Sequence, residues 1–579
     1  MLQSALNRLL PTEVPSVVQA GLGRILGLDR LEATYRQLRE QEGQEPIPDR
    51  LIRHLQVTCR ASPADLRRVP RQGAVVAVVN HPYGILEGAV LASLLRPIRE
   101  DVKFLANSLL AGIPEIRDLV IPVDPFGGPQ ATRANRAGVR QALQHLRQGG
   151  MLVVFPAGEV AHFRWKDWEI ADPEWNSGVA RLIRASGAAV TPMWIGGANS
   201  LLFQALGLLH PRLRTAMLAR ELLNKRGAQV EVRIGSPVAA EKLLTLPDDE
   251  ARTQYLRWCT HLLANRQDFK ARTSRPLRRG KALEKAPVAA AVPAELLAAD
   301  VASLNPLTRS GDLAAYLATA AELPHVLPEI GRLREITFRA AGEGAGKPLD
   351  LDRFDEHYQH LFVWNERKRE IAGAYRLGQV DVVPELYTAT LFKYDAALLD
   401  RLGPALELGR SFVRAEYQKS FSPLLLLWLG IGKFLARHPR YKVLFGPVSI
   451  SNQYPTISRQ LMVSFLERHA TLDCWKDLVA ARNPFRGPRA AHSGLDLEDL
   501  GDVVTDVDPA RPGVPVLLRQ YLKLGGKLLG FNLDPDFSDA LDGLIVVDLT
   551  QTEPKWLDRY LGKEWRIPAT GDGSTDPQT

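Results

Sequence analysis

Residues 74–95 read AVVAVVNHPYGILEGAVLASLL, and this stretch decides the fold predicted for the first half of the chain. Its opening run of alanine and valine stops abruptly at Asn80, as a buried strand of an α/β sheet does, and a helix-like apolar run follows Glu87. A polar turn at the end of such a strand lines a cleft, which places His81 there. We expect Glu87 to hold the His81 ring so that it can accept a proton from a hydroxyl group. A local hydrogen bond without a catalytic role is the alternative.

The same alternation of short apolar strands and helices continues to about residue 235. It predicts an α/β domain with a mostly buried sheet. The further strands are expected at 103–106, 119–123, 151–155, 189–195 and 229–234, with helices at 133–146 and 177–186.

The second half also mixes helices and strands, but in a different order. A helix at 328–340 is followed by a predicted hairpin, 358–364 and 371–377, which implies antiparallel pairing. Further strands are expected at 405–413, 443–448 and 544–549. The fold class is therefore α/β with two domains of different architecture.

A change in composition separates the two halves. Arginine and then alanine and proline dominate from about residue 273 to residue 300, and strand signals vanish there. The predicted division is a first domain at 1–272, a basic and then Ala/Pro-rich linker at 273–300, a second domain at 301–567 and a disordered tail at 568–579.

Composition limits the class of protein and the compartment. Of the 579 residues, 45% are hydrophobic and 24% are charged, which is typical of a soluble globular protein. The three cysteines, Cys59, Cys259 and Cys474, lie too far apart for a disulfide framework or a zinc ribbon, so a reducing compartment is expected. No apolar run is long enough to cross a bilayer; the best candidate, 422–436, is predicted to be a buried or interfacial helix.

The net charge of +8 is unevenly distributed. Residues 266–285 carry eight Lys or Arg against two acidic residues. A short basic stretch of this kind favours an anionic membrane surface or an acidic carrier protein over a nucleic-acid groove. A solvated linker is the alternative.

A second polar turn, FPAGE at 155–159, follows the strand MLVV and completes a motif. The chain from about 50 to 240 resembles the glycerolipid acyltransferases, which include the lysophosphatidate acyltransferases. That family has Asn-His, four residues and Asp, then Phe-Pro-Glu-Gly-Thr, and an arginine that binds a phosphate. In this chain the first acid, Glu87, lies one residue further from the histidine, and the second acid, Glu159, follows the glycine instead of preceding it. The matching stretch IPVDPF at 121–126 has no arginine, which weakens the case for an acceptor that carries a phosphate. The resemblance implies catalytic His81 and Glu87 and substrate-binding Asn80, Gly84, Gly158 and Glu159.

The second half places charged residues inside strand-like segments. A buried charge without a partner costs several kcal/mol, so these residues need one another. We expect one interlocked set made of Asp355, Arg376, Glu407 and Arg410. A buried ion network with no catalytic role is the alternative. His357 and His360 lack a convincing set of further ligands, so no metal is predicted.

The order of these residues from about 324 to 561 resembles the acyl-amino-acid branch of the GNAT-like acyltransferases, which also holds the acyl-homoserine-lactone synthases. The ornithine-lipid N-acyltransferases in addition have a late segment like 514–531, followed here by Asp534 and Asp542. The resemblance implies that Glu407 is the base or the water-orienting residue for the attacking amine. It also implies that Arg376, Arg410, Asp352 and Asp355 bind substrate. The coenzyme A loop of GNAT enzymes is not evident, which favours acyl carrier protein as the donor.

Two different acyltransferase-like halves on one chain resemble the bifunctional ornithine-lipid synthases of bacteria. The carboxyl half would acylate the α-amine of ornithine with a 3-hydroxyacyl group, and the amino half would then acylate the new hydroxyl. Acyl carrier protein and a lipid surface are the expected partners, and neither a nucleic acid nor a cofactor is expected. Acyl-coenzyme A is an alternative donor for the amino half. The expected location is cytoplasmic, on the inner face of the cytoplasmic membrane; the oligomeric state stays open. The alternatives are glycine as the acceptor, a lysophospholipid acyltransferase, or a membrane-binding protein with inactive sites.

Overall fold

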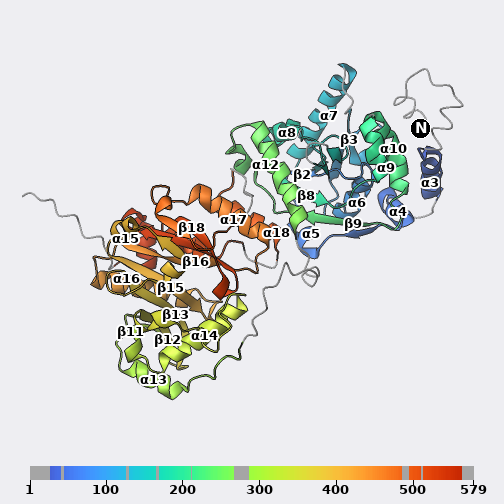
Figure 1. Cartoon of the computed structure of the whole chain (residues 1–579). Coiled ribbons are helices and arrows are strands. Elements are labelled where there is room, and N and C mark those ends of the chain that lie inside the picture. Colours follow the sequence, from blue (N-terminus) through green and yellow to red (C-terminus); the bar gives the residue numbers. More distant parts are fainter. Residues whose placement is uncertain are drawn as a thin grey trace, which may run out of the picture. The chain divides into compact units, whose positions relative to one another are not determined.

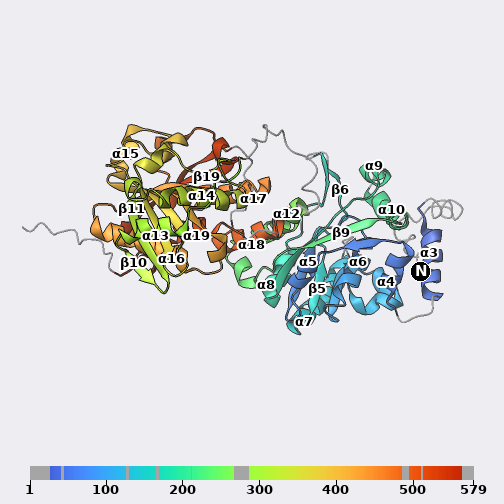
Figure 2. The ribbon, with the colours of Figure 1, turned by 90° about the horizontal axis from the view of Figure 1, so that it is seen from below.

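The computed structural model describes residues 26–40, 45–124, 129–164, 168–209, 211–266, 286–485, 494–509 and 513–563. The chain forms two compact units (Figures 1 and 2). Unit 1 comprises residues 1–267 and 492–509, and unit 2 comprises residues 268–491 and 510–579. Both units are mixed α/β, which confirms the predicted fold class. The disordered tail predicted at 568–579 and most of the basic stretch lie outside the described residues.

Unit 1 is built on a seven-stranded sheet in the order β1-β9-β8-β2-β5-β3-β4. β2 pairs in parallel with both β5 and β8, and β9 runs antiparallel to β8. All five residues of β2 are buried, so both faces of the sheet are covered, as the uninterrupted apolar runs predicted. The strands are β1 (Thr58–Arg60), β2 (Val75–Val79), β3 (Val102–Asn107), β4 (Val120–Val123), β5 (Met151–Val154), β8 (Ala189–Ile195) and β9 (Gln229–Ile234), beside a separate hairpin of β6 (His162–Arg164) and β7 (Glu169–Ala171).

The helices of unit 1 pack around this sheet, and those between β1 and β9 connect its strands (Figure 1). They are α3 (Leu28–Glu40), α4 (Ile47–His54), α5 (Pro63–Arg68), α6 (Leu86–Leu95), α7 (Pro129–Arg147), α8 (Gly178–Ser186), α9 (Leu201–Leu209), α10 (Pro211–Leu223), α11 (Ala240–Leu244), α12 (Asp249–Leu262) and α18 (Leu497–Val507). The connection from β2 to α6 is the polar turn that the sequence singled out.

Helix α18 corrects the predicted domain boundaries, because a segment from far along the chain belongs to unit 1. Asp506 of α18 is 8% exposed, pairs with Arg68 at 2.9 Å and accepts hydrogen bonds from the backbone and the hydroxyl of Ser236. Arg266 donates to the Asp506 carbonyl at 2.6 Å. The predicted continuous domain at 301–567 is therefore wrong: its apolar and acidic residues near 500 complete the first unit.

Unit 2 contains an eight-stranded sheet in the order β10-β11-β12-β13-β15-β16-β19-β18. Its strands pair antiparallel except for β15 and β16, which are parallel only from Ala405↔Val443 to Glu407↔Phe445. Beyond this point β15 continues along β13 and β16 continues along β19. The strands are β10 (Thr308–Ser310), β11 (Leu313–Thr319), β12 (Gln359–Asn365), β13 (Glu370–Gln379), β15 (Ala405–Val413), β16 (Val443–Ile450), β18 (Lys527–Asp534) and β19 (Ala540–Asp548), with a small sheet of β14 (Phe392–Tyr394) and β17 (Val479–Ala481).

The helices of unit 2 show where the predicted linker ends. They are α13 (Ala294–Ala302), α14 (Val326–Ala340), α15 (Ala396–Leu402), α16 (Ser422–Arg437), α17 (Thr456–His469), α19 (Val516–Lys523) and α20 (Pro554–Tyr560). Leu297 and Val301 of α13 lie in the core beside Phe362, so the linker predicted to reach residue 300 is wrong. Alanine is the best helix former, and two apolar residues one turn apart suffice to dock the helix.

The apolar segment near residue 430 is a buried helix of unit 2. In α16, Leu427, Trp428 and Ile431 have no measurable exposure. Among the described residues, no helix is both long and apolar enough to span a membrane.

Candidate active sites

In unit 1, His81 and Glu87 meet at the end of β2. Nδ1 of His81 lies 2.7 Å from Oε1 of Glu87. The same carboxylate oxygen accepts the backbone N–H groups of Tyr83 at 3.0 Å and Gly84 at 2.7 Å. The His81 side chain is 15% exposed and that of Glu87 is fully buried. No hydrogen bond from a described residue reaches Nε2 of His81, so this nitrogen is the one available for chemistry.

Glu87 is held in its charged form. Burial alone raises the pKa of its carboxyl group, but His81 and the Gly84 N–H outweigh burial and lower the pKa below its ordinary value. A carboxylate at this position fixes the proton of the ring on Nδ1 and leaves Nε2 to act as an acceptor. The geometry is therefore that of a histidine general base oriented by a buried carboxylate.

Asp172, just after β7, is a second anchor of His81 that the sequence did not reveal. Its carboxylate accepts the backbone N–H of His81 at 3.1 Å and the indole N–H of Trp175 at 3.2 Å, and it is 1% exposed. His261 of α12 lies 3.8 Å from the same carboxylate, and burial lowers the pKa of this histidine. Ninety residues separate His81 from Asp172, and no spacing rule links them.

Asn80 ties the site to the sheet, and a substrate-binding role for Asn80 and Gly84 stays a prediction. Its side chain donates to the carbonyl of Ile195 at 2.9 Å and accepts the N–H of Ile195 at 2.7 Å. The amide thus extends the pairing of β2 with β8 by one position beyond the last strand residues. Gly84 is required by space: its φ is +103°, and a Cβ there would lie 2.7 Å from Leu218 and 2.9 Å from Val160.

The turn after β5 reaches His81 through different residues from those predicted. The Phe155 ring stacks on the imidazole with centroids 4.5 Å apart, and the N–H of Ala161 donates to the His81 carbonyl at 2.7 Å. Gly158 has φ +67°, which fits a tight turn. Glu159 instead points to the surface, 60% exposed, and pairs with Arg214 at 2.7 Å. A substrate-binding role for Gly158 and Glu159 stays a prediction.

In unit 2, a buried ion network links α14 to β13 through the loop between them. Arg376 of β13 pairs with Asp352 at 2.6 Å and with Asp355 at 3.3 Å. Arg334 of α14 pairs with Asp355 at 2.8 Å, and the two guanidinium groups hold the pKa of that carboxyl far below its usual range against the effect of burial. The predicted link between Asp355 and Arg376 is therefore present.

Arg410 lies where β15 and β16 part. Its φ of +49° is unusual for a residue with a side chain. The guanidinium lies 3.6 Å from Asp350 and 3.7 Å from Asp352, and it stacks over the rings of Tyr387 and Phe537. It donates no hydrogen bond to a described residue, so its N–H groups can receive a carboxylate from a substrate.

Glu407 does not belong to the ion network, and this part of the prediction is wrong. One carboxylate oxygen accepts the N–H of Thr388 at 2.7 Å; the other accepts the hydroxyl of Tyr358 and the N–H of Tyr387. Glu407 is 1% exposed. Successive side chains of a strand point to opposite faces of the sheet. Glu407 and Arg410 are three residues apart and therefore lie on different faces. With both oxygens engaged, Glu407 is placed to position the Tyr387 loop.

His360 is a core residue. It is fully buried, its Nε2 bonds to the carbonyl of Asp355 at 2.9 Å, and burial together with Arg334 lowers its pKa to about 4. Within the part of the chain that the structure describes, no three His, Cys, Asp or Glu side chains are grouped as metal ligands would be.

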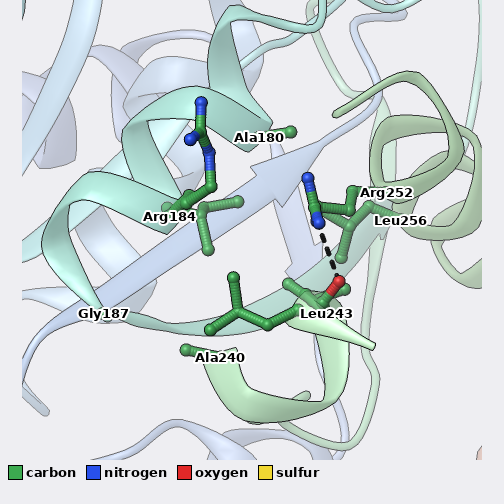
Figure 3. Close-up of a pocket in the computed structure, with 9 residues that line it drawn as sticks. Ala180, Arg184, Gly187, Ala240, Leu243, Arg252 and Leu256 are labelled. Atoms are coloured by element: carbon green, nitrogen blue, oxygen red, sulfur yellow. Dashed lines mark hydrogen bonds between the residues drawn. The ribbon is translucent and has the colours of Figure 1, made fainter. Parts of the chain in front are cut away.

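Unit 1 also contains a small apolar hollow (Figure 3), and His81 is not among the residues that line it. It is lined by residues of α8, α11 and α12, among them Leu243 and Leu256, and Arg252 donates to the Leu243 carbonyl at its edge. Gly187 of the lining comes just before β8 begins, whereas His81 follows the end of the parallel strand β2. The hollow therefore lies toward the amino ends of the parallel strands, whereas His81 lies at their carboxyl ends.

Comparison with known proteins finds a family model in each half of the chain. Residues 12–270 match the family model described as acyltransferase, and residues 333–428 match the model described as acetyltransferase (GNAT) domain. A glycine N(alpha)-acyltransferase of Bacteroides thetaiotaomicron is 33% identical over 270 residues, which cover 42% of this chain and 80% of that protein. A lyso-glycine lipid O-acyltransferase of the same organism is 27% identical over 184 residues, covering 30% of this chain and 64% of that protein.

Among solved structures, FeeM, an N-acyl amino acid synthase from uncultured soil microbes, matches 44% of this chain and 97% of its own length, at 12% identity and a TM-score of 0.24.

The fold, the sites and the family models define an acyltransferase with an amino-terminal acyltransferase domain and a carboxyl-terminal GNAT domain. The chain belongs to the family of the Bacteroides glycine N(alpha)-acyltransferase. The prediction of an acyltransferase is confirmed, and so is the pairing of two different acyltransferase domains. Ornithine is not the amino acid that the relatives' names give.

Proposed function

We propose that the protein makes an amino-acid lipid in two acyl transfers: unit 2 acylates the α-amine of an amino acid with a 3-hydroxyacyl group, and unit 1 acylates the hydroxyl of that product. The observation that carries the proposal is His81 Nδ1 at 2.7 Å from buried Glu87, in a chain that also contains a GNAT domain. A histidine base suits a hydroxyl acceptor, and the first transfer supplies such an acceptor.

For O-acylation, the hydroxyl oxygen of the mono-acylated lipid attacks the carbonyl carbon of an acyl thioester while Nε2 of His81 takes the hydroxyl proton. The tetrahedral adduct expels the thiolate, which receives the proton from His81, so the enzyme is restored after each turnover. Glu87 holds the ring through Nδ1, and Phe155 supports its face. General base catalysis of this kind contributes about 10²- to 10⁴-fold.

For N-acylation, Arg410 is the residue placed to bind the carboxylate of the amino acid. It lies beside the point where β15 and β16 part, and it is stacked between Tyr387 and Phe537. Beyond Glu407 and Phe445 the two strands no longer pair with each other, and their facing edges suit an extended thioester arm. The free amine attacks the thioester carbonyl, the thiolate leaves, and the amine proton neutralises it.

The donor and the location are also proposals. Acyl carrier protein is the proposed donor, because the sequence lacks an evident coenzyme A loop. A lipid surface is the proposed location, supported by the basic stretch 266–285 and by products that carry two acyl chains.

Two amino acids are candidates for the acceptor. The resemblance of the sequence to ornithine-lipid synthases favours ornithine. The names of the relatives favour glycine.

The test is mass spectrometry of lipids from a bacterial host that expresses the chain. Wild-type protein is expected to yield a di-acylated amino-acid lipid, and His81→Ala only the mono-acylated one. His54→Ala, at the last residue of α4, removes a histidine that is not bonded to Glu87, so it is the matched control and should resemble wild type. If neither lipid forms, or if His81→Ala still makes the di-acylated lipid, the proposal is overturned.

A further inference from the structure

Unit 2 holds three acidic residues on one face of its sheet, close to Arg410. Asp542 of β19 lies opposite Ser449 of β16, and the Ser449 hydroxyl donates to Glu343 at 3.1 Å. On its other side, Asp542 lies opposite Asn532 of β18, and Asp534 is two residues further along that strand. Side chains two apart on a strand share a face, so Asp534 lies on the same face as Asn532 and Asp542. Glu343 follows α14 and is brought to this face by the Ser449 hydroxyl.

This acidic cluster, Glu343, Asp534 and Asp542, is buried and short of cations. Its members are 8%, 5% and 5% exposed. Arg410 is the cation that acts on all three, yet it is already shared between Asp350 and Asp352. The Asp542 carboxylate accepts no hydrogen bond from any described residue. A buried carboxylate without a partner is costly, and a bound cation would remove that cost.

The charge state of the cluster shows how strongly a cation is needed. Burial, opposed by Ser449 and Arg410, raises the pKa of Glu343 to about 7. Burial, together with the charges of Asp534 and Glu343, raises the pKa of Asp542 well above its ordinary value. An ammonium group placed among them would allow all three carboxyls to ionise.

Tyr387 adds an aromatic wall to the cluster. Its ring lies 4.9 Å from the Arg410 guanidinium, and the charges of Asp534 and Asp542 act on its hydroxyl. That hydroxyl has no hydrogen-bond partner among the described residues. Carboxylates beside an aromatic face are a typical site for an organic ammonium ion.

An amine bound among three carboxylates is held as ammonium and is not a nucleophile, because nearby negative charge stabilises its protonated form. The amine that is acylated must therefore be a different one. Glycine has a single amine, whereas a diamino acid has one to react and one to be held.

We propose that Glu343, Asp534 and Asp542 form a subsite for the side-chain ammonium of a diamino-acid acceptor and that they set the specificity of N-acylation. The inference rests on the proposed function of unit 2. Arg410 binds the α-carboxylate, the acidic cluster binds the distal ammonium, and the α-amine stays free to attack the thioester.

The test measures N-acylation by the purified full chain with acyl carrier protein thioester and three acceptors: ornithine, glycine and norvaline, which matches ornithine without the second amine. Wild-type protein is expected to use ornithine at least about 100-fold better than norvaline, as kcat/KM, the usual worth of a buried charge pair. Asp542→Asn is expected to lose about that factor for ornithine, mainly through KM, and to leave norvaline within about threefold.

Controls separate specificity from folding. Asp558→Asn changes an exposed acid on α20 and should behave as wild type. The norvaline rate of Asp542→Asn, and its O-acylation of added mono-acylated lipid, report whether the variant is folded; if both are lost, Asp534→Asn is measured in its place.

Wild-type protein that acylates glycine or norvaline as well as ornithine would overturn the subsite while leaving the proposed function intact. Equal losses for ornithine and norvaline in a folded variant would do the same. Transfer to none of the three acceptors would overturn the proposed function itself, and the subsite with it.

Discussion

Gly84 and His81 share one carboxylate oxygen: the Gly84 N–H lies 2.7 Å, and the His81 Nδ1 2.7 Å, from Oε1 of Glu87. The turn that carries the histidine is thus closed on the same atom that orients its ring. The closure of the turn and the orientation of the ring therefore depend on the same buried side chain.

Glu87→Gln should lower O-acylation by about 10- to 100-fold, less than the loss expected for His81→Ala. An amide still accepts from Gly84, but it no longer stabilises the imidazolium that forms during proton transfer. O-acylation of purified mono-acylated lipid is the measurement, with the exposed Glu174→Gln in the same unit as control. A rate within twofold of wild type would remove Glu87 from the mechanism.

Asp172→Asn should weaken both fold and activity of unit 1. The carboxylate accepts N–H groups from His81 and Trp175, and an amide presents one acceptor fewer while adding two donors. We expect about 1–3 kcal/mol of lost stability, the usual cost of an unsatisfied buried group, and a lower kcat for O-acylation. Denaturant unfolding measures the lost stability, and O-acylation rates at varied concentrations of mono-acylated lipid measure kcat. N-acylation should be unchanged, and its loss would show that the damage is not local.

Glu407→Gln should reduce N-acylation by loosening the Tyr387 loop. Both oxygens of Glu407 accept N–H or O–H groups, so one amide nitrogen would face a donor. In cells less lipid should form, whereas added mono-acylated lipid should still be converted by unit 1 at the wild-type rate. Rates at several pH values distinguish positioning from base catalysis: a positioning residue changes KM for the amino acid without moving the pH profile. A shifted profile would instead return Glu407 to the role of base.

Glu343→Gln should stabilise the protein at high pH. Between the ordinary value of 4.5 and the raised pKa of about 7, the unfolded chain ionises Glu343 while the folded chain keeps it protonated. The contribution of Glu343 to the free energy of unfolding of the wild-type protein is therefore fully present below about pH 4.5 and falls as the pH rises to about 7. The variant cannot ionise, so its advantage should grow over that window to about 1–3 kcal/mol at pH 8. Chemical unfolding at pH 5 and pH 8 measures this advantage. The exposed Glu553→Gln is the control, and an advantage that does not depend on pH would contradict the assignment.

Residues 1–285 expressed alone should be unstable, because they lack α18. Arg68 would lose Asp506, and Arg266 would lose the Asp506 carbonyl. Joining residues 494–509 to the end of this fragment through a flexible linker should restore cooperative unfolding. Equal melting temperatures with and without the added helix would contradict this.

The sequence predicted the strands of unit 1 well because their apolar runs are uninterrupted, as in 75–79 and 151–154. His81 and Glu87 were found because one turn connects them. Asp172 was not, since a contact across ninety residues leaves no local pattern. Strand β11, LAAYLAT, was missed because alanine carries little strand signal.

Charges in unit 2 show where sequence patterns stop being sufficient. The need for partners was evident for Arg376 and Glu407, but the choice of partner depends on which face each residue occupies. A left-handed backbone at Arg410 and the parting of β15 from β16 decide that choice, and neither is visible as a periodicity. The acids Asp534 and Asp542 were noticed only as part of a resemblance, without a role.

The return of the chain to unit 1 at α18 has a consequence for its biosynthesis. The ribosome has to make roughly 240 residues after the last strand and helix of unit 1 before α18 emerges, which takes about 12–48 s at ordinary elongation rates of about 5–20 residues per second. During that interval Arg68 and Arg266 lack the partner that α18 brings, so unit 1 cannot finish folding first. Unit 1 is thus completed only when most of unit 2 has already been synthesised. An mRNA truncated between residue 267 and α18 therefore encodes neither unit in full.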